Sequence, residues 1–198
     1  MGRRLRLAGA LAALASVAFG VPGSAQTPAP TVVVVVRHAE KASSADRDPS
    51  LSEAGRLRAQ DLAHALAGAG IGAAVVTQFR RTIETARPTV AAASGAAPIP
   101  VDTVAVGGSL DAHIAAVASA VHRHAGRNVL VVGHSNTVTR IVEALGVPGP
   151  RLPDLCDGDY SELFTVVIPP GGGPARLIRS QYGQPAADAA CQTMQISR

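Results

Sequence analysis

The sequence predicts an α/β fold, a three-layer α/β/α sandwich with a mostly parallel central sheet. Short valine-rich runs alternate three or four times with segments of helical spacing, and the connections between them are short. Such alternation is typical of parallel sheets that carry helices on both faces. Hydrophobic residues make up 47% of the chain but aromatic residues only 3%, so we expect a core of small and branched aliphatic side chains.

The individual elements follow from periodicity and from helix-breaking residues. Thr31 to Val36 is a continuous β-branched run, which indicates a strand covered on both faces. The apolar residues between Leu110 and Val121 recur at helical spacing. Pro88 is expected to kink or end the helix that contains it. In order, we expect strands at 31–36, 73–77, 99–101, 129–132, 163–168 and 175–180, and helices from 52 to the glycines at 68–72 and at 80–93, 110–121 and 138–145.

The first 25 residues have the pattern of a secretory signal peptide. A start with three arginines precedes the apolar run Leu7–Val21, and small residues at 23–25 suit a signal peptidase. The alternative, a membrane anchor, is disfavoured because the run is shorter than the roughly 20 residues that span a bilayer. We expect cleavage after Ala25, a short tether at 26–30 and one domain at 31–198. The mature protein would be periplasmic or secreted, without a stable membrane anchor.

The charge of the mature chain argues against nucleic acid as a partner. The formal net charge is +4, and removal of the three signal-peptide arginines leaves +1. Lys41 is the only lysine, and the sequence has no basic arm interleaved with aromatic residues.

The two cysteines, Cys156 and Cys191, both lie in the last quarter of the chain. In an oxidising compartment we expect them to form a disulfide, which would close a loop of about 35 residues and stabilise the fold by roughly 3–4 kcal/mol. A catalytic thiol is the alternative, but neither cysteine has a neighbouring histidine or glycine-rich loop.

Two histidines lie directly after predicted strands. His38 follows a valine run and Arg37, and His134 follows another such strand. Arg80 and Arg81 come shortly after a third strand. Because the carboxyl ends of parallel strands meet at one edge of a sheet, these side chains should converge on one crevice.

This set of side chains suits a phosphoryl group. The planar fork of arginine can hold two phosphate oxygens and stays charged at any working pH. A neutral imidazole nitrogen can attack phosphorus when the other ring nitrogen is held as N–H by an acceptor. A second, protonated histidine can stabilise the equatorial oxygens as charge builds in the transition state. Such an arrangement requires no metal.

Three segments resemble the motifs of a known family. Residues 37–40, Arg-His-Ala-Glu, are similar to the Arg-His-Gly/Ala-Glu signature of the histidine phosphatase superfamily, the phosphoglycerate mutase-like enzymes. Residues 77–86 resemble its second motif, in which an arginine lies four residues before Thr-Ala. Residues 133–137, Gly-His-Ser-Asn-Thr, resemble its second-histidine motif. The resemblance runs from about Val32 to Ser180.

The resemblance implies a function for each matching residue. His38 would be the nucleophile that forms a phosphohistidine. Arg37, Arg81 and His134 would bind the phosphoryl group, and Ser44 would be a further phosphate contact. The family works without a metal or an organic cofactor. The partner would be a small phosphorylated substrate or a phosphorylated group on a larger molecule.

The proton donor departs from the family pattern. Many members carry an acidic residue after the third strand, but here Asp102 and Asp111 are the only carboxylates in that segment. Asp111 is the candidate general acid, although it is also placed to stabilise a helix N-terminus. Without an acid, leaving groups of low pKa would still depart readily.

The short chain also bears on the shape of the pocket. Only about fifty residues separate the second motif from the second histidine, so we expect a compact member with no lid domain and an open pocket. The remaining histidines are expected on solvated polar faces; they are His64, His113, His122 and His124.

The leading hypothesis is an exported phosphatase, and other classes stay open. A mutase is disfavoured because export removes the chain from cytoplasmic metabolites. In addition, the segment after the third strand lacks the glutamate that would be expected there. A non-catalytic binder of phosphorylated envelope ligands would keep the arginines with poor turnover. A metal-binding envelope protein would depend on loosely spaced histidines.

Overall fold

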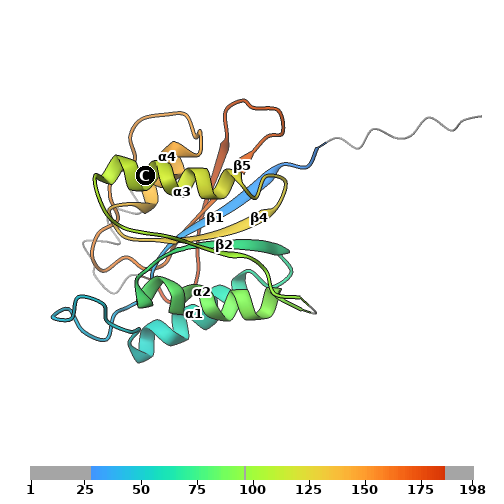
Figure 1. Cartoon of the computed structure of the whole chain (residues 1–198). Helices are drawn as coiled ribbons and strands as arrows, with labels where there is room; N and C mark the ends of the chain where they lie inside the picture. The colour runs from blue at the N-terminus through green and yellow to red at the C-terminus, as the bar shows by residue number, and fades with distance from the viewer. Residues whose placement is uncertain (1–27, 96, 186–198) are drawn as a thin grey trace, which may run out of the picture.

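A computed structural model of the chain describes residues 28–95 and 97–185. The expected signal peptide, the first two residues of the tether and Cys191 lie outside the described residues. The described part is a sheet between two layers of helices, with α1 and α2 below it and α3 and α4 above it in Figure 1. The strands are β1 (Thr31–Arg37), β2 (Ile71–Thr77), β3 (Val101–Val104), β4 (Asn128–Gly133), β5 (Glu162–Ile168) and β6 (Arg176–Gln181), and the helices are α1 (Glu53–Ala65), α2 (Arg80–Ala93), α3 (Leu110–His122) and α4 (Val138–Ala144).

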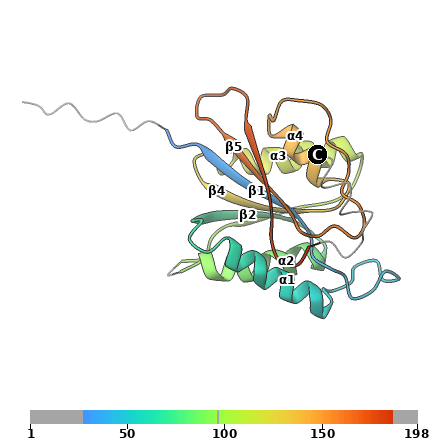
Figure 2. The ribbon, with the colours of Figure 1, turned by 180° about the vertical axis from the view of Figure 1, so that it is seen from behind.

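The sheet has the strand order β3-β2-β4-β1-β5-β6. The first four strands in this order pair in parallel, and β5 and β6 form an antiparallel hairpin that extends the sheet beyond β1. Figure 2 shows the two helix layers from behind, on either side of the sheet. The predicted three-layer α/β/α architecture with a mostly parallel sheet is confirmed.

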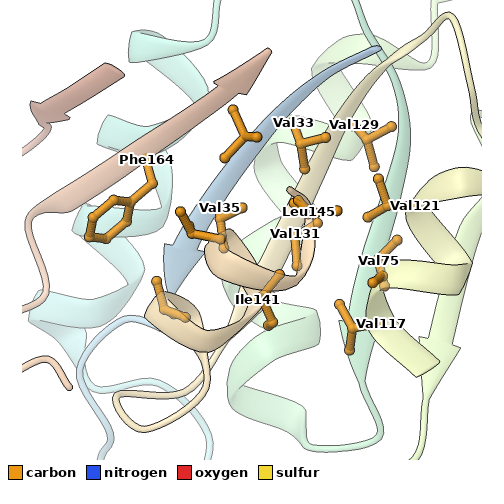
Figure 3. Packing of buried hydrophobic residues seen from close by; sticks show 14 of the residues in the cluster. Val33, Val35, Val75, Val117, Val121, Val129, Val131, Ile141, Leu145 and Phe164 are labelled. Carbon is orange, nitrogen blue, oxygen red and sulfur yellow. The ribbon is translucent and has the colours of Figure 1, made fainter. Parts of the chain in front are cut away.

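The valine run of β1 supplies both faces of the core. Val33 and Val35 are fully buried and pack in the layer shared with α3 and α4, together with Phe164 of β5 (Figure 3). Val34 and Val36 point into the opposite layer, which α1 and α2 cover. This alternation is the pleat of a strand buried on both faces, and it fixes the direction in which the chain leaves β1.

The helix α1 begins where the sequence predicts and is held close to the end of β1. Ser52 caps it, because its Oγ accepts a hydrogen bond from the Gly55 amide over 3.0 Å. A Cβ atom on Gly55 would overlap the carbonyl oxygen of Glu40, so this approach requires glycine. The start of α1 is thereby packed against the segment that follows His38.

Helix α2 has the predicted bounds, Arg80–Ala93, and it continues through Pro88 instead of ending there. The third strand runs from Val101 to Val104 instead of 99–101, since its pairing with β2 begins at Val101. Among the residues that the structure describes, no helix is long and apolar enough to cross a membrane.

Candidate active site

His38 lies immediately after β1, with its ring orientation set by the backbone. Its Nδ1 is 2.8 Å from the carbonyl oxygen of Ala39. A carbonyl only accepts, so Nδ1 carries the proton and Nε2 keeps its lone pair. The Ala39 amide in turn donates to Thr85 Oγ1 over 2.9 Å, which ties the loop to α2. A nucleophilic histidine needs an acceptor that holds its other ring nitrogen as N–H, and the Ala39 carbonyl is such an acceptor.

The electrostatic surroundings keep His38 neutral. Burial lowers the pKa of its imidazole to about 3, and the positive charges of Arg37 and Arg81 act in the same direction. The hydrogen bond to Ala39 opposes this shift without overcoming it. His38 is therefore an unprotonated base over the whole physiological pH range.

Arg37, the last residue of β1, is fixed by the loop that precedes β5. Its Nη1 donates to three carbonyl oxygens, those of Cys156 at 2.8 Å, Asp157 at 2.9 Å and Asp159 at 3.0 Å. The guanidinium also stacks on Tyr160, with Cζ 4.1 Å from the ring centroid. Its buried Nε–H makes no hydrogen bond with the described residues, so the guanidinium of Arg37 retains a donor for an anion.

His134 follows β4 and lies beside His38, with 5.3 Å between the two ring centroids. Its Nε2 is 3.2 Å from Thr77 Oγ1 at the end of β2. Burial, followed by the charge of Arg81, lowers the pKa of His134 to about 3. The second histidine was expected to be protonated, whereas in the free protein this ring is neutral.

Arg81 lies in the first turn of α2 and completes the group. Its Cζ is 4.2 Å from the centroid of Phe79, and Nη1 is 4.0 Å from a carboxylate oxygen of Asp48. The Arg80 side chain is exposed and pairs with Glu84 over 3.7 Å. The structure thus brings Arg81, and not Arg80, to the two histidines, as the motif spacing predicts.

These side chains border one open cavity of about 480 Å³ at the carboxyl ends of β1, β2 and β4. Its size is that of an ordinary small-molecule site. The residues lining it that the sequence analysis did not assign to the site include Lys41, Phe79, His113 and Asp157. His113 could have been found from the sequence, because it lies four residues before the buried Val117 on the same helix.

Two of the predicted site residues are not brought to this cavity. Ser44 is exposed and does not line it. Asp111 is also outside it, with a side chain that is 84% exposed and a carboxylate 3.2 Å from Arg140 Nη2. Asp102 pairs with Arg123 at 2.8 Å and His124 at 3.1 Å. The helix that starts at Leu110 turns the Asp111 side chain toward solvent, away from the cavity.

The histidines other than His38 and His134 differ in how exposed their side chains are. His64 and His122 are exposed as predicted, whereas His113 is only 4% exposed and belongs to the cavity wall. No group of three or more His, Cys, Asp or Glu side chains that could hold a metal ion occurs within residues 28–95 and 97–185.

The fold and the site define a class of protein. Residues 33–104 match the sequence profile of the histidine phosphatase superfamily (branch 1), and solved members share the fold. The matched segment contains Arg37, His38 and Arg81, and the fold of the described chain is similar to that of these solved structures.

Similar solved structures come from several proteins of this kind. The protein histidine phosphatase SixA, complexed with tungstate, is 20% identical over 76% of this chain and 96% of that chain, with a TM-score of 0.58. The mycobacterial glucosyl-3-phosphoglycerate phosphatase is 16% identical over 78% of this chain and 100% of that chain, with a TM-score of 0.59. At these identities the likeness shows a shared fold. No protein of curated function matches the sequence significantly.

Proposed function

We propose that this chain is an exported phosphatase that hydrolyses phosphomonoesters or similar phosphorylated groups through a phosphohistidine on His38. One observation carries the proposal. The ring of His38 is neutral, its Nδ1 is fixed by the Ala39 carbonyl, and it lies beside two arginines in an open cavity. This leaves Nε2 as a lone pair next to the place where a phosphoryl group would be held.

The binding step follows from the charges. A phosphoryl dianion between Arg37 and Arg81 would offset the positive field that disfavours protonation of the histidines. His134 would then gain a proton as the substrate binds and would stabilise the oxygens during transfer. Its contact with Thr77 orients the ring in both protonation states, since a hydroxyl can donate or accept.

The transfer to His38 depends chiefly on positioning and on stabilisation of charge. The lone pair of His38 Nε2 attacks phosphorus in line with the leaving group, and water later attacks the phosphohistidine from the side that the leaving group has vacated. The sequence does not specify the substrate. The cavity is open to solvent and suits either a small molecule or a phosphorylated side chain. A test panel should include a phosphoramidate and a sugar phosphate, the latter because one structural neighbour is a glucosyl-3-phosphoglycerate phosphatase.

The direct test is hydrolysis of a chromogenic aryl phosphate by the purified mature protein in the presence of EDTA. We expect the wild type to turn over and the activity to resist the chelator. His38→Ala should lower kcat/KM by at least about 1000-fold, as removal of a nucleophile does. His64→Ala is the matched control, because that histidine is exposed on α1, away from the cavity.

Three results would count against the proposal. Activity that disappears with EDTA would favour a metal enzyme. Tight binding of phosphorylated ligands without hydrolysis of any panel member would favour the non-catalytic binder. Transfer of the phosphoryl group between two positions of a substrate, faster than its release to water, would favour the mutase.

Export and the disulfide are part of the same proposal. Cleavage after Ala25 would release the domain into an oxidising compartment, where Cys156 would pair with Cys191, which lies outside the described residues. The bond would anchor the loop whose Cys156 carbonyl holds Arg37. The full-length chain, expressed in a bacterial host, should be recovered from the periplasm. Its intact mass should match a start at Gln26 with two hydrogens fewer than the reduced chain. A cytoplasmic, uncleaved chain or two free thiols would contradict this part.

A further inference from the structure

A third histidine, His113, forms part of the wall of the cavity. It lies in the first turn of α3, is only 4% exposed, and lines the same cavity as His38 and His134. It is near enough to His134 that, after burial and Arg81, a charge on His113 contributes to the low pKa of that ring. His113 is thus a buried ionisable group at the site that the steps above do not use.

The tautomer of His113 is fixed in the same way as that of His38. Its Nδ1 is 3.2 Å from the carbonyl oxygen of Ala105, so Nδ1 carries a proton. Its Nε2 is buried and makes no hydrogen bond with any described residue. A proton can therefore be added to Nε2 or removed from it while Ala105 holds the ring in place. This is what a group that gives and takes a proton requires.

The carboxylates that could otherwise act as the acid are poorly placed. Asp111 and Asp102 are paired with arginines outside the cavity. Among the described residues, Asp157 is the one carboxylate that lines the cavity. Its exposed side chain belongs to the loop that holds Arg37, and the negative charge there supports that guanidinium.

We propose that His113 is the proton donor to the leaving group, an inference that rests on the phosphatase function proposed above. The proton arrives with the substrate: a phosphomonoester monoanion gives it to Nε2 of His113 and remains as a dianion between the arginines. The Nε2 lone pair of His38 then forms the N–P bond. The bond from phosphorus to the leaving oxygen breaks, and that oxygen keeps the electron pair and takes the proton from His113.

The second half of the cycle returns the proton. Water attacks the phosphohistidine, and Nε2 of His113 accepts a proton from the attacking water. The N–P bond breaks and its electron pair returns to His38. Phosphate then leaves, and the proton on His113 goes to phosphate or to solvent. Each step balances without a metal or a redox partner.

The test compares His113→Asn with the wild type on phosphomonoesters whose leaving groups differ in basicity. An asparagine amide takes the position of Nδ1, so it can still donate to Ala105 while Nε2 is removed. The series contains 4-nitrophenyl phosphate, phenyl phosphate and an alkyl phosphate. We expect kcat for the nitrophenyl ester to change by no more than a few-fold, because its leaving group needs no proton. The alkyl ester should lose on the order of 100-fold, the usual contribution of a general acid.

Controls separate this inference from the function on which it rests. His122→Asn changes an exposed histidine at the other end of α3 and should leave all three rates unchanged. Equal losses on all three esters, or no loss, would overturn the assignment to His113 and leave the phosphatase intact. A loss that depends on the leaving group in Asp157→Asn, and not in His113→Asn, would move the donor to Asp157. Failure of the wild type to hydrolyse any ester would instead reject the phosphatase function.

Discussion

At the scale of single residues, backbone carbonyls decide the chemistry of the site. Ala39 and Ala105 each accept a hydrogen bond from Nδ1 of a histidine, which leaves Nε2 of His38 and His113 as the reactive nitrogens. His134 is instead held through its Nε2 by a hydroxyl. His134 therefore differs from His38 and His113 in which ring nitrogen is available, and the sequence alone does not show this difference.

Burial of neutral histidines has a consequence for stability. The unfolded chain binds a proton on each histidine near pH 6.5, whereas folded His38 and His134 do so only near pH 3. The unfolded state thus binds more protons between these values, so the free energy of unfolding falls as the pH drops. For one such histidine the loss between pH 7 and pH 5 is about 2 kcal/mol.

Urea denaturation at pH 7 and pH 5 measures this loss. His38→Gln, or His134→Gln, should lose about 2 kcal/mol less than the wild type on acidification. His64→Gln should behave as the wild type, since that ring is exposed. Equal losses in the wild type and in both buried-site variants would show that these rings are not held neutral in the fold.

The sequence predicted the residues of the site that depend on strand ends, and missed those that depend on loops. His38, His134 and Arg81 follow buried strands directly or within a few residues, so a parallel sheet brings all three to its carboxyl edge. The carbonyls that hold Arg37 come from an irregular loop more than a hundred residues further along the chain. No periodicity specifies such a contact.

At the scale of elements, the start of α1 is bound to the loop after β1. Arg58 of α1 donates from Nε to Glu40 over 2.8 Å and is itself buried, and Gly55 lies against the Glu40 backbone. Glu40, part of the sequence motif, is therefore a structural anchor of the loop that begins with His38. The position of the nucleophile depends on how closely this helix approaches.

Gly55→Ala tests that dependence. The added Cβ would overlap the Glu40 carbonyl, so helix and loop must separate. We expect a loss of about 2 kcal/mol in the free energy of unfolding, measured in urea, together with a lower kcat. Gly72→Ala is the matched control, because its Cβ would meet only the Arg127 side chain at an ordinary 3.6 Å. Unchanged stability and turnover in Gly55→Ala would contradict the account of this contact.

Element boundaries were predictable where a local signal exists. Ser52 caps α1 as expected, and α3 begins at Leu110, because caps and stripes are properties of short segments. Helix α2 also has its predicted bounds, Arg80–Ala93, and of the two effects expected of Pro88, a kink or an end, the end is not observed.

At the scale of the whole molecule, the fold class was predictable and the strand order was not. Alternating strands and helices indicate a layered sandwich, whatever the order of strands. The structure puts β1 between β4 and β5, which are distant in sequence. That order is what places His38 beside His134, and it depends on long-range pairing that no local pattern records.

The central claim is that Nε2 of His38 carries the phosphoryl group during turnover. Wild-type protein would be mixed with a labelled phosphomonoester, quenched within one turnover in alkaline denaturant, and digested for mass spectrometry. We expect label on the peptide that contains His38, and this label should be stable in alkali, labile in acid, and lost when unlabelled substrate is added before the quench. Hydrolysis that proceeds with no label on His38, or with label on His134 or His113 instead, would contradict it.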